Sequence, residues 1–189
     1  MFDQETWKFI NSFAPWLAAI GTVAAVITAL YLARKDARIQ LKVRALIRFV
    51  AIVGTDLGPG PDYVSVEVSN VGRRVATVTY IYWKTGIFRK KNYVWLVPQN
   101  PYSANIPVKL HDGEQATFMD LMTQFERGIK KFAEEDLSGW ASGLKGRFVR
   151  VGVGTSTGDR FEALVDKSLR ARFLEMARKA DKTKDVEPT

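Results

Sequence analysis

The sequence contains no cysteine and only one histidine, His111. Without cysteine the chain cannot form a disulfide, and a single histidine cannot by itself build a recognisable zinc site. We therefore expect no disulfide, no bound metal and no cofactor. The absence of cysteine also agrees with a reducing compartment such as the cytoplasm.

Charge is missing from one long stretch near the N-terminus, because no acidic or basic residue lies between Phe9 and Ala33. A helix that crosses a bilayer needs about 20 apolar residues, and residues 13–33 supply that length. Large apolar side chains point to every side of such a helix, so it is not an interfacial amphipathic helix. Pro15 would lie in its first turn. We predict a transmembrane helix at residues 13–33, preceded by a short extracytoplasmic N-terminus, residues 1–12.

A cleaved signal peptide and a buried core helix are the two other interpretations of this stretch. A signal peptide has a basic N-terminal region and a small-residue cleavage site. Here Asp3 and Glu5 outweigh Lys8, and no A-x-A site precedes Arg34. A core helix rarely runs so far without charge, so the membrane span is the favoured interpretation.

Basic residues follow the apolar stretch at once, whereas only Lys8 precedes it. Basic flanks stay on the cytoplasmic side of a membrane. We therefore predict a single-pass protein of the inner (plasma) membrane, with its N-terminus outside and its large C-terminal domain in the cytoplasm. We expect the basic residues after the span to contact lipid head groups. They are Arg34, Lys35, Arg38, Lys42 and Arg44.

Small residues recur every three or four positions along the apolar stretch, which places them on one side of the helix. Such a stripe lets membrane helices approach closely and pack. Alanine is also simply a common apolar residue, so plain anchoring remains the alternative to a homo-oligomer. The candidate helix-packing residues are Ala18, Gly21, Thr22, Ala25 and Ala29.

The chain carries a net charge of +8. Asp3, Glu5 and Lys8 give the first 33 residues a charge of −1, so the remaining residues carry +9. A basic domain beside a membrane can bind anionic lipid head groups or nucleic acid. One basic loop between aromatic residues is a candidate contact for an anionic partner. A solvent-exposed loop or a second lipid contact is favoured over nucleic acid. The loop consists of Arg89, Lys90 and Lys91.

From Ile39 onward, apolar residues alternate with polar ones, as is typical of half-buried strands. Turns rich in glycine, proline and asparagine separate these runs. The predicted strands are residues 39–53, 63–69, 75–83, 86–98, 106–110, 114–119, 147–155 and 160–165.

Two of the turns are short enough to predict hairpins. The turn of Asn70, Val71 and Gly72 connects residues 63–69 to residues 75–83. Residues 156–159 connect the last two strands in the same way.

Two segments show helical spacing instead of alternation. Residues 121–137 place apolar side chains on one face and charged side chains on the other, and Gly139 is placed to end the helix. Asp166 is placed to cap a second helix at residues 168–180. The polar tail, residues 181–189, is expected to be disordered.

Many short strands joined by turns, without alternating strands and helices, indicate an antiparallel sandwich. Four stretches of the chain read LYLARKDARIQLKV, VSVEVSNVGRRVATVTYIYW, LHDGE and VGTSTGDRF. In these stretches the chain resembles uncharacterised bacterial single-pass membrane proteins that carry a cytoplasmic immunoglobulin-like domain. The resemblance implies a membrane anchor followed by a basic immunoglobulin-like β-sandwich at residues 34–180. The family has no established activity, so the resemblance implies none for this chain. The inserted helix and the C-terminal helix depart from a plain seven-strand domain.

No catalytic constellation emerges from the motifs. Residues 154–158 read G-x-S-x-G, but a nucleophile elbow needs a helix after the serine and a later histidine. Here a predicted strand follows, and His111 comes earlier. Glu134, Glu135 and Asp136 are consecutive on a helix and point in different directions, so they form no carboxylate pair. We predict that the chain is not an enzyme.

We therefore expect a membrane-tethered protein-interaction or scaffold module, acting as an accessory subunit at the inner membrane face with a protein partner still to be identified. One alternative is an oligomeric membrane effector of a bacterial, antiphage-type (antiviral) defence system. The other is a membrane protein that binds nucleic acid, which is the least favoured of the three.

Overall fold

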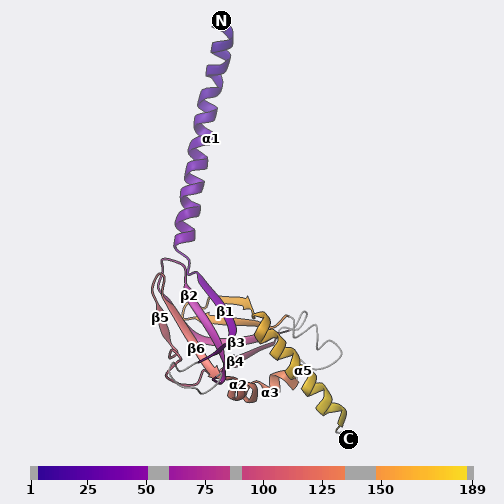
Figure 1. The fold of residues 1–189 in the computed structure, drawn as a ribbon. Coiled ribbons are helices and arrows are strands. Elements are labelled where there is room, and N and C mark those ends of the chain that lie inside the picture. Colours follow the sequence, from indigo (N-terminus) through magenta and orange to yellow (C-terminus); the bar gives the residue numbers. More distant parts are fainter. Residues whose placement is uncertain (1–3, 51–59, 86–90, 135–147, 187–189) are drawn as a thin grey trace. The chain divides into compact units, whose positions relative to one another are not determined.

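The computed structural model describes residues 4–50, 60–85, 91–134 and 148–186. It divides the chain into two compact units, Met1–Arg38 and Ile39–Thr189. The first unit is a single helix, and the second contains two sheets and the shorter helices (Figure 1). The elements are α1 Gln4–Asp36, β1 Leu41–Phe49, β2 Asp62–Asn70, β3 Ala76–Thr85, β4 Lys91–Trp95, β5 Val108–Leu110, β6 Gln115–Leu121, α2 Met122–Gly128, α3 Lys130–Phe132, β7 Arg150–Thr155, β8 Arg160–Leu164 and α5 Lys167–Val186.

Helix α1 is longer than the predicted span. Because the polar residues before the apolar stretch are also helical, α1 begins at Gln4, and Pro15 lies inside the helix and not in its first turn. Within α1, Phe13–Asp36 is long and apolar enough to cross a membrane, and none of it is buried. The predicted N-terminal apolar helix is therefore confirmed.

The second unit contains two antiparallel sheets. In the three-stranded sheet, β2 lies between β1 and β6. In the five-stranded sheet, the strands follow the order β4, β3, β7, β8, and β5 pairs with the start of β3. β7 pairs with β8, which confirms the second predicted hairpin. The prediction of a mainly antiparallel β-domain is confirmed.

One backbone hydrogen bond from a neighbouring segment reaches each edge strand of the three-stranded sheet. At one edge, the N–H of Asp166, just after β8, donates to the carbonyl of Ala45 in β1 at 2.9 Å. At the other edge, the N–H of Ala104 donates to the carbonyl of Thr117 in β6 at 2.8 Å. An uncovered edge presents unpaired N–H and C=O groups to other chains. Among the described strands, β4 has only β3 as a partner.

Alternating apolar side chains from both sheets fill the core, and aromatic rings complete it beside the helices. The ring of Trp83 in β3 lies 5.2 Å from that of Phe125 in α2 and 5.5 Å from that of Phe173 in α5. Phe132 in α3 lies 6.5 Å from Phe173. Because aromatic side chains bury large apolar areas, this cluster fixes the three helices against β3.

The turn after β2 does not form the predicted hairpin, because β2 and β3 belong to different sheets. The buried side chain of Asn70 holds this sheet-to-sheet corner. Its Oδ1 accepts from the N–H of Gly72 at 3.0 Å, and its Nδ2 donates to the carbonyls of Arg74 at 2.7 Å and Leu110 at 2.9 Å. Leu110 ends β5, so a contact 40 residues away decides where the chain goes after the turn.

The predicted inserted helix is broken into α2 and α3 at Ile129, which has φ −100° and ψ 10°. Gly128, a poor helix former, ends α2. The predicted apolar face is confirmed over the described part, and Phe125, Ile129 and Phe132 are buried. The end of the predicted helix, residues 135–137, lies outside the described residues.

Helix α5 begins as predicted, since Oδ2 of Asp166 accepts from the N–H of Lys167 at 2.7 Å. Leu169, Phe173 and Ala177 form its buried face. It ends at Val186, beyond the predicted end at residue 180 and inside the tail that we expected to be disordered. The reason is local, because neither glycine nor proline interrupts the chain before Pro188.

We expect Asn70→Ala to lower the free energy of unfolding by about 3 kcal/mol, because the change leaves one N–H and two carbonyl groups of the corner without their partner. Thermal unfolding of the detergent-solubilised full-length chain measures the effect. Ser69→Ala is the matched control, because the Ser69 hydroxyl bonds only to an exposed side chain, Gln115. Equal stability of the two variants would contradict the assigned role of Asn70.

Candidate functional site

The predicted helix-packing residues lie together on α1. Gly21 has no neighbouring atom within 4 Å of an ideal Cβ position. The hydroxyl of Thr22 donates to the carbonyl of Ala18 at 2.7 Å, and that of Thr28 donates to the carbonyl of Ala24 at 2.8 Å. Both hydroxyls are therefore satisfied within their own helix, as a lipid environment requires. Self-association through this stripe stays a prediction.

The predicted lipid-contact residues fall in three places. Arg34 and Lys35 lie in the last turn of α1, and Arg38 follows it. Lys42 and Arg44 are exposed on β1, where they alternate with the buried Val43 and Ala45. Of the candidate anionic-partner loop, Lys91 is the first residue of β4, and Arg89 and Lys90 lie outside the described residues.

The G-x-S-x-G sequence forms the turn between β7 and β8, as predicted. The N–H of Gly158 donates to the carbonyl of Thr155 at 3.0 Å, and Gly158 has a φ of 87°. The hydroxyl of Thr157 donates to Oδ2 of Asp159 at 2.8 Å. A strand follows this turn, so Ser156 does not have the geometry of a nucleophile elbow.

His111 is exposed in the turn before β6, where its backbone N–H donates to Oε2 of Glu114 at 2.7 Å. Within the described residues, no group of three or more histidine, aspartate or glutamate side chains could hold a metal ion. Glu134 is described, whereas Glu135 and Asp136 are not.

Asp120 near the end of β6 is a buried carboxyl that the sequence analysis did not select. Burial raises its pKa, and hydrogen bonds from the Trp95 side chain and the Leu121 backbone partly offset that effect. Asp120 lies opposite the buried Val64 in the strand register and so faces the core. It is an internal polar group beside Trp95 rather than part of an open site.

The outer face of the five-stranded sheet is built from tyrosine rings over glycine residues. Tyr82 lies over Gly152, where an added Cβ would come within 2.1 Å of the ring, and Tyr80 lies over Gly154 with a corresponding distance of 2.2 Å. A side chain at either position would displace the tyrosine ring from this packing, because the rings lie directly on the bare backbone. This packing explains the alternation of valine and glycine along β7.

Glu162 on β8 binds three side chains of the same face. Its Oε1 accepts from the hydroxyl of Tyr82 at 3.0 Å and pairs with Nζ of Lys84, and its Oε2 lies 3.8 Å from Nη1 of Arg150. Burial alone would raise the pKa of Glu162, but Lys84, Tyr82 and Arg150 outweigh burial and lower it. Burial and the hydrogen bond to Glu162 raise the pKa of Tyr82 to about 12.

A groove of about 230 Å³ lies beside β4. β4 pairs with β3 along Ile81–Thr85 and β5 pairs along Ala76–Val78, so no described strand pairs with the two β3 residues in between on this side. Leu96 and Val94 at the groove are 88% and 54% exposed. Residues that line the groove include Thr79, Tyr80, Val94, Leu96, Pro98 and Ile106.

This arrangement can receive an extended segment of another protein. No second described strand pairs with β4, so its outer edge can accept an added strand, and the groove offers room for apolar side chains. The sequence analysis did not select the groove, because its walls come from β3, from the segment after β4 and from the segment before β5. The local signal in the sequence is that Val94 and Leu96 are both apolar and, by alternation, share the face of the strand opposite Trp95.

We expect Glu162→Gln to lower the free energy of unfolding by about 1 kcal/mol at neutral pH, because an amide cannot pair with Lys84 and Arg150. A carboxyl whose pKa is lowered in the folded state stabilises the fold above its ordinary value of 4.5, and this contribution is lost as the pH falls through the folded-state value. Urea unfolding of both proteins over a pH series should therefore show a difference that shrinks below pH 4.5. A difference that does not change with pH would rule out the paired carboxylate.

Comparison with known proteins finds no matching family model and no matching curated protein. Among solved structures, one similar chain is a Bordetella pertussis protein assigned as ApaA, with 14% identity and a TM-score of 0.30 over 68% of this chain and 89% of that one. Another is the structural genomics target SoR45, with 13% identity and a TM-score of 0.25 over 69% of this chain and 84% of that one. Because both TM-scores are low, the proposals for fold and function rest on the geometry of this chain alone.

Proposed function

We propose that the chain is a membrane-anchored protein-interaction module that acts as an accessory subunit at the inner face of the membrane and catalyses no reaction. Helix α1 is the anchor, and the second unit, folded as an immunoglobulin-like sandwich, carries the partner site. The basic residues Arg34, Lys35 and Arg38 after the span support an N-terminus outside and the second unit in the cytoplasm.

The observation that carries the proposal is the groove beside β4. Each edge strand of the other sheet accepts a backbone hydrogen bond from a neighbouring segment, whereas β4 has β3 as its one strand partner among the described strands. Beside it, Leu96 exposes nearly its whole side chain. A single exposed leucine is ordinary, but Val94 and the groove continue the same apolar surface, which is typical of an interaction site.

The partner that fits this site is a protein segment in extended conformation with apolar side chains at alternate positions. Such a segment can add to the edge of β4 through backbone hydrogen bonds, and every second side chain then points toward the groove. Affinity of this kind depends on a few buried anchors. Leu96 is the anchor that this chain supplies.

We expect Leu96→Asp to reduce partner capture about 30-fold, which corresponds to the loss of one anchor residue of about 2 kcal/mol. The full-length chain is purified from cross-linked membranes in mild detergent, and the proteins that it captures are quantified for wild type and variant.

Leu164→Asp is the matched control, because Leu164 is 50% exposed but lies on β8 and does not line the groove. A protein that is captured by wild type and by Leu164→Asp but lost with Leu96→Asp is the predicted partner. Capture of the same proteins in equal amounts by Leu96→Asp would overturn the assignment of the groove.

A further inference from the structure

One end of the second unit gathers turns that are far apart in the sequence. β1 begins there, because Leu41 pairs with Asn70 in the strand register. The N–H of Gly113, between β5 and β6, donates to the carbonyl of Asn70 at 3.0 Å. The N–H of Ser156, after β7, donates to the carbonyl of Thr77 at 3.0 Å. The sheet-to-sheet corner, residues 71–75, thus lies at the end of the unit where the chain enters it.

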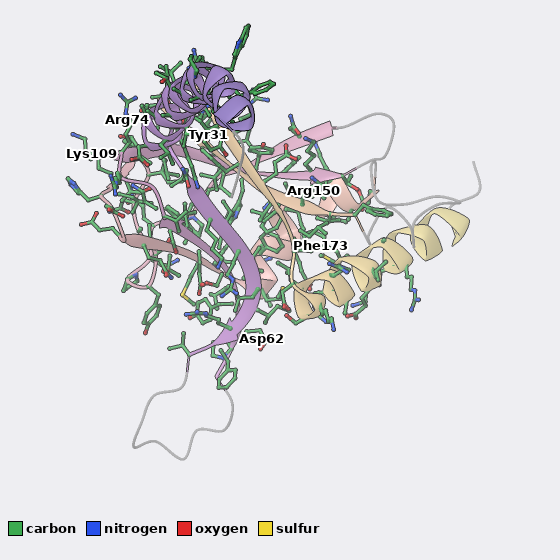
Figure 2. The ribbon with its side chains drawn as sticks, turned by 90° about the horizontal axis from the view of Figure 1, so that it is seen from above. Tyr31, Asp62, Arg74, Lys109, Arg150 and Phe173 are labelled. Atoms are coloured by element: carbon green, nitrogen blue, oxygen red, sulfur yellow. The ribbon has the colours of Figure 1, made fainter. Side chains whose placement is uncertain are left out.

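The surface of this corner is both apolar and basic. Val71 and Val75 are 56% and 47% exposed, and the exposed Arg73 and Arg74 lie between them. The exposed Lys109 on β5 lies beside the corner, since Nδ2 of Asn70 donates to the carbonyls of both Arg74 and Leu110. Figure 2 shows Arg74 and Lys109 close together, with Asp62 at the other end of β2.

Basic side chains outnumber acidic ones at this end of the unit. The exposed basic residues are Lys42, Arg73, Arg74, Lys109 and Arg160. The exposed acidic residues are Asp112, Glu114 and Asp159. Glu114 and Asp159 also accept hydrogen bonds within their own turns, from the N–H of His111 and the hydroxyl of Thr157.

Covalent connection limits how far this corner can lie from the apolar helix. The N–H of Val71 donates to the carbonyl of Gln40 at 2.9 Å, and a Cβ on Gly72 would lie 3.1 Å from Gln40. Between Ala33, the last residue of the uncharged stretch, and Gln40 the chain has the final turn of α1, a turn at residues 37–38 and residue 39. It therefore spans at most about 20 Å, which is comparable with the head-group layer plus a Debye length.

We propose that the corner of Val71, Arg73, Arg74 and Val75, together with Lys109, docks on the anionic phospholipid head groups of the membrane leaflet that α1 leaves. The arginine and lysine side chains pair with lipid phosphates, and the two valine side chains enter the interface between head groups and acyl chains. The short connection keeps the corner near the leaflet, and its charge selects anionic lipids. This surface is separate from the groove beside β4, so neither depends on the other.

The absence of cysteine provides a direct test, because a single introduced cysteine can be labelled without background. The full-length chain carrying Val75→Cys is labelled with an environment-sensitive fluorophore and reconstituted into nanodiscs that contain brominated lipids. The nanodiscs contain phosphatidylcholine alone or phosphatidylcholine with phosphatidylglycerol. Leu164→Cys is the matched control, because Leu164 is similarly exposed but pairs with Arg150 at the opposite end of the sheet.

We expect lipid quenching at position 75 in the nanodiscs with phosphatidylglycerol, weaker quenching with phosphatidylcholine alone, and little quenching at position 164. Each basic side chain near an anionic surface raises the ratio of docked to undocked domain about fivefold. The double variant Arg73→Gln with Arg74→Gln should therefore reduce this ratio about 25-fold. Equal quenching at the two positions would overturn the proposal. The proposal would also be overturned if quenching at position 75 were the same with and without phosphatidylglycerol and were unchanged by the double substitution.

Discussion

The buried amide of Asn70 fixes the corner at which the chain leaves one sheet for the other. Its bonds to Gly72, Arg74 and Leu110 join the end of β2, the approach to β3 and the end of β5. The same corner receives the first residues of the second unit through Gln40. One polar side chain therefore determines both how the two sheets are connected and which turns lie beside the point where the chain arrives from the apolar helix.

The two sheets differ in which edges and faces remain accessible to partners. In the three-stranded sheet, Asp166 and Ala104 bond to the outer strands. In the five-stranded sheet, the tyrosine and glycine packing and the Glu162 ion pairs occupy the outer face. Among the described strands, β4 pairs with β3 alone, and beside it the partner of β3 changes from β4 to β5 and Leu96 is exposed. A protein partner at this edge and lipid at the corner would engage different parts of the domain at once.

Local sequence patterns are sufficient to predict the apolar helix, most strands, the β7–β8 hairpin and the buried faces of the later helices, because each pattern depends on residues within the element itself. The patterns fail where contacts between residues far apart in the sequence determine the structure. Turn chemistry at Asn70 suits a hairpin or a corner equally well, and the bonds that distinguish them involve distant residues such as Leu110, Gly113 and Gln40. The β4 groove depends on where β4 leaves β3 and β5 joins it, and no local pattern encodes that.

The central claim is that α1 spans the membrane and holds the second unit in the cytoplasm. Gln124 is exposed on α2, far from α1 in the sequence, and Gln124→Cys would be the only thiol of the chain. The measurement is labelling of this cysteine by a membrane-impermeant maleimide in intact spheroplasts and after permeabilisation. The account predicts labelling only after permeabilisation, with the protein resistant to carbonate extraction. Labelling in intact spheroplasts, or release by carbonate, would contradict it.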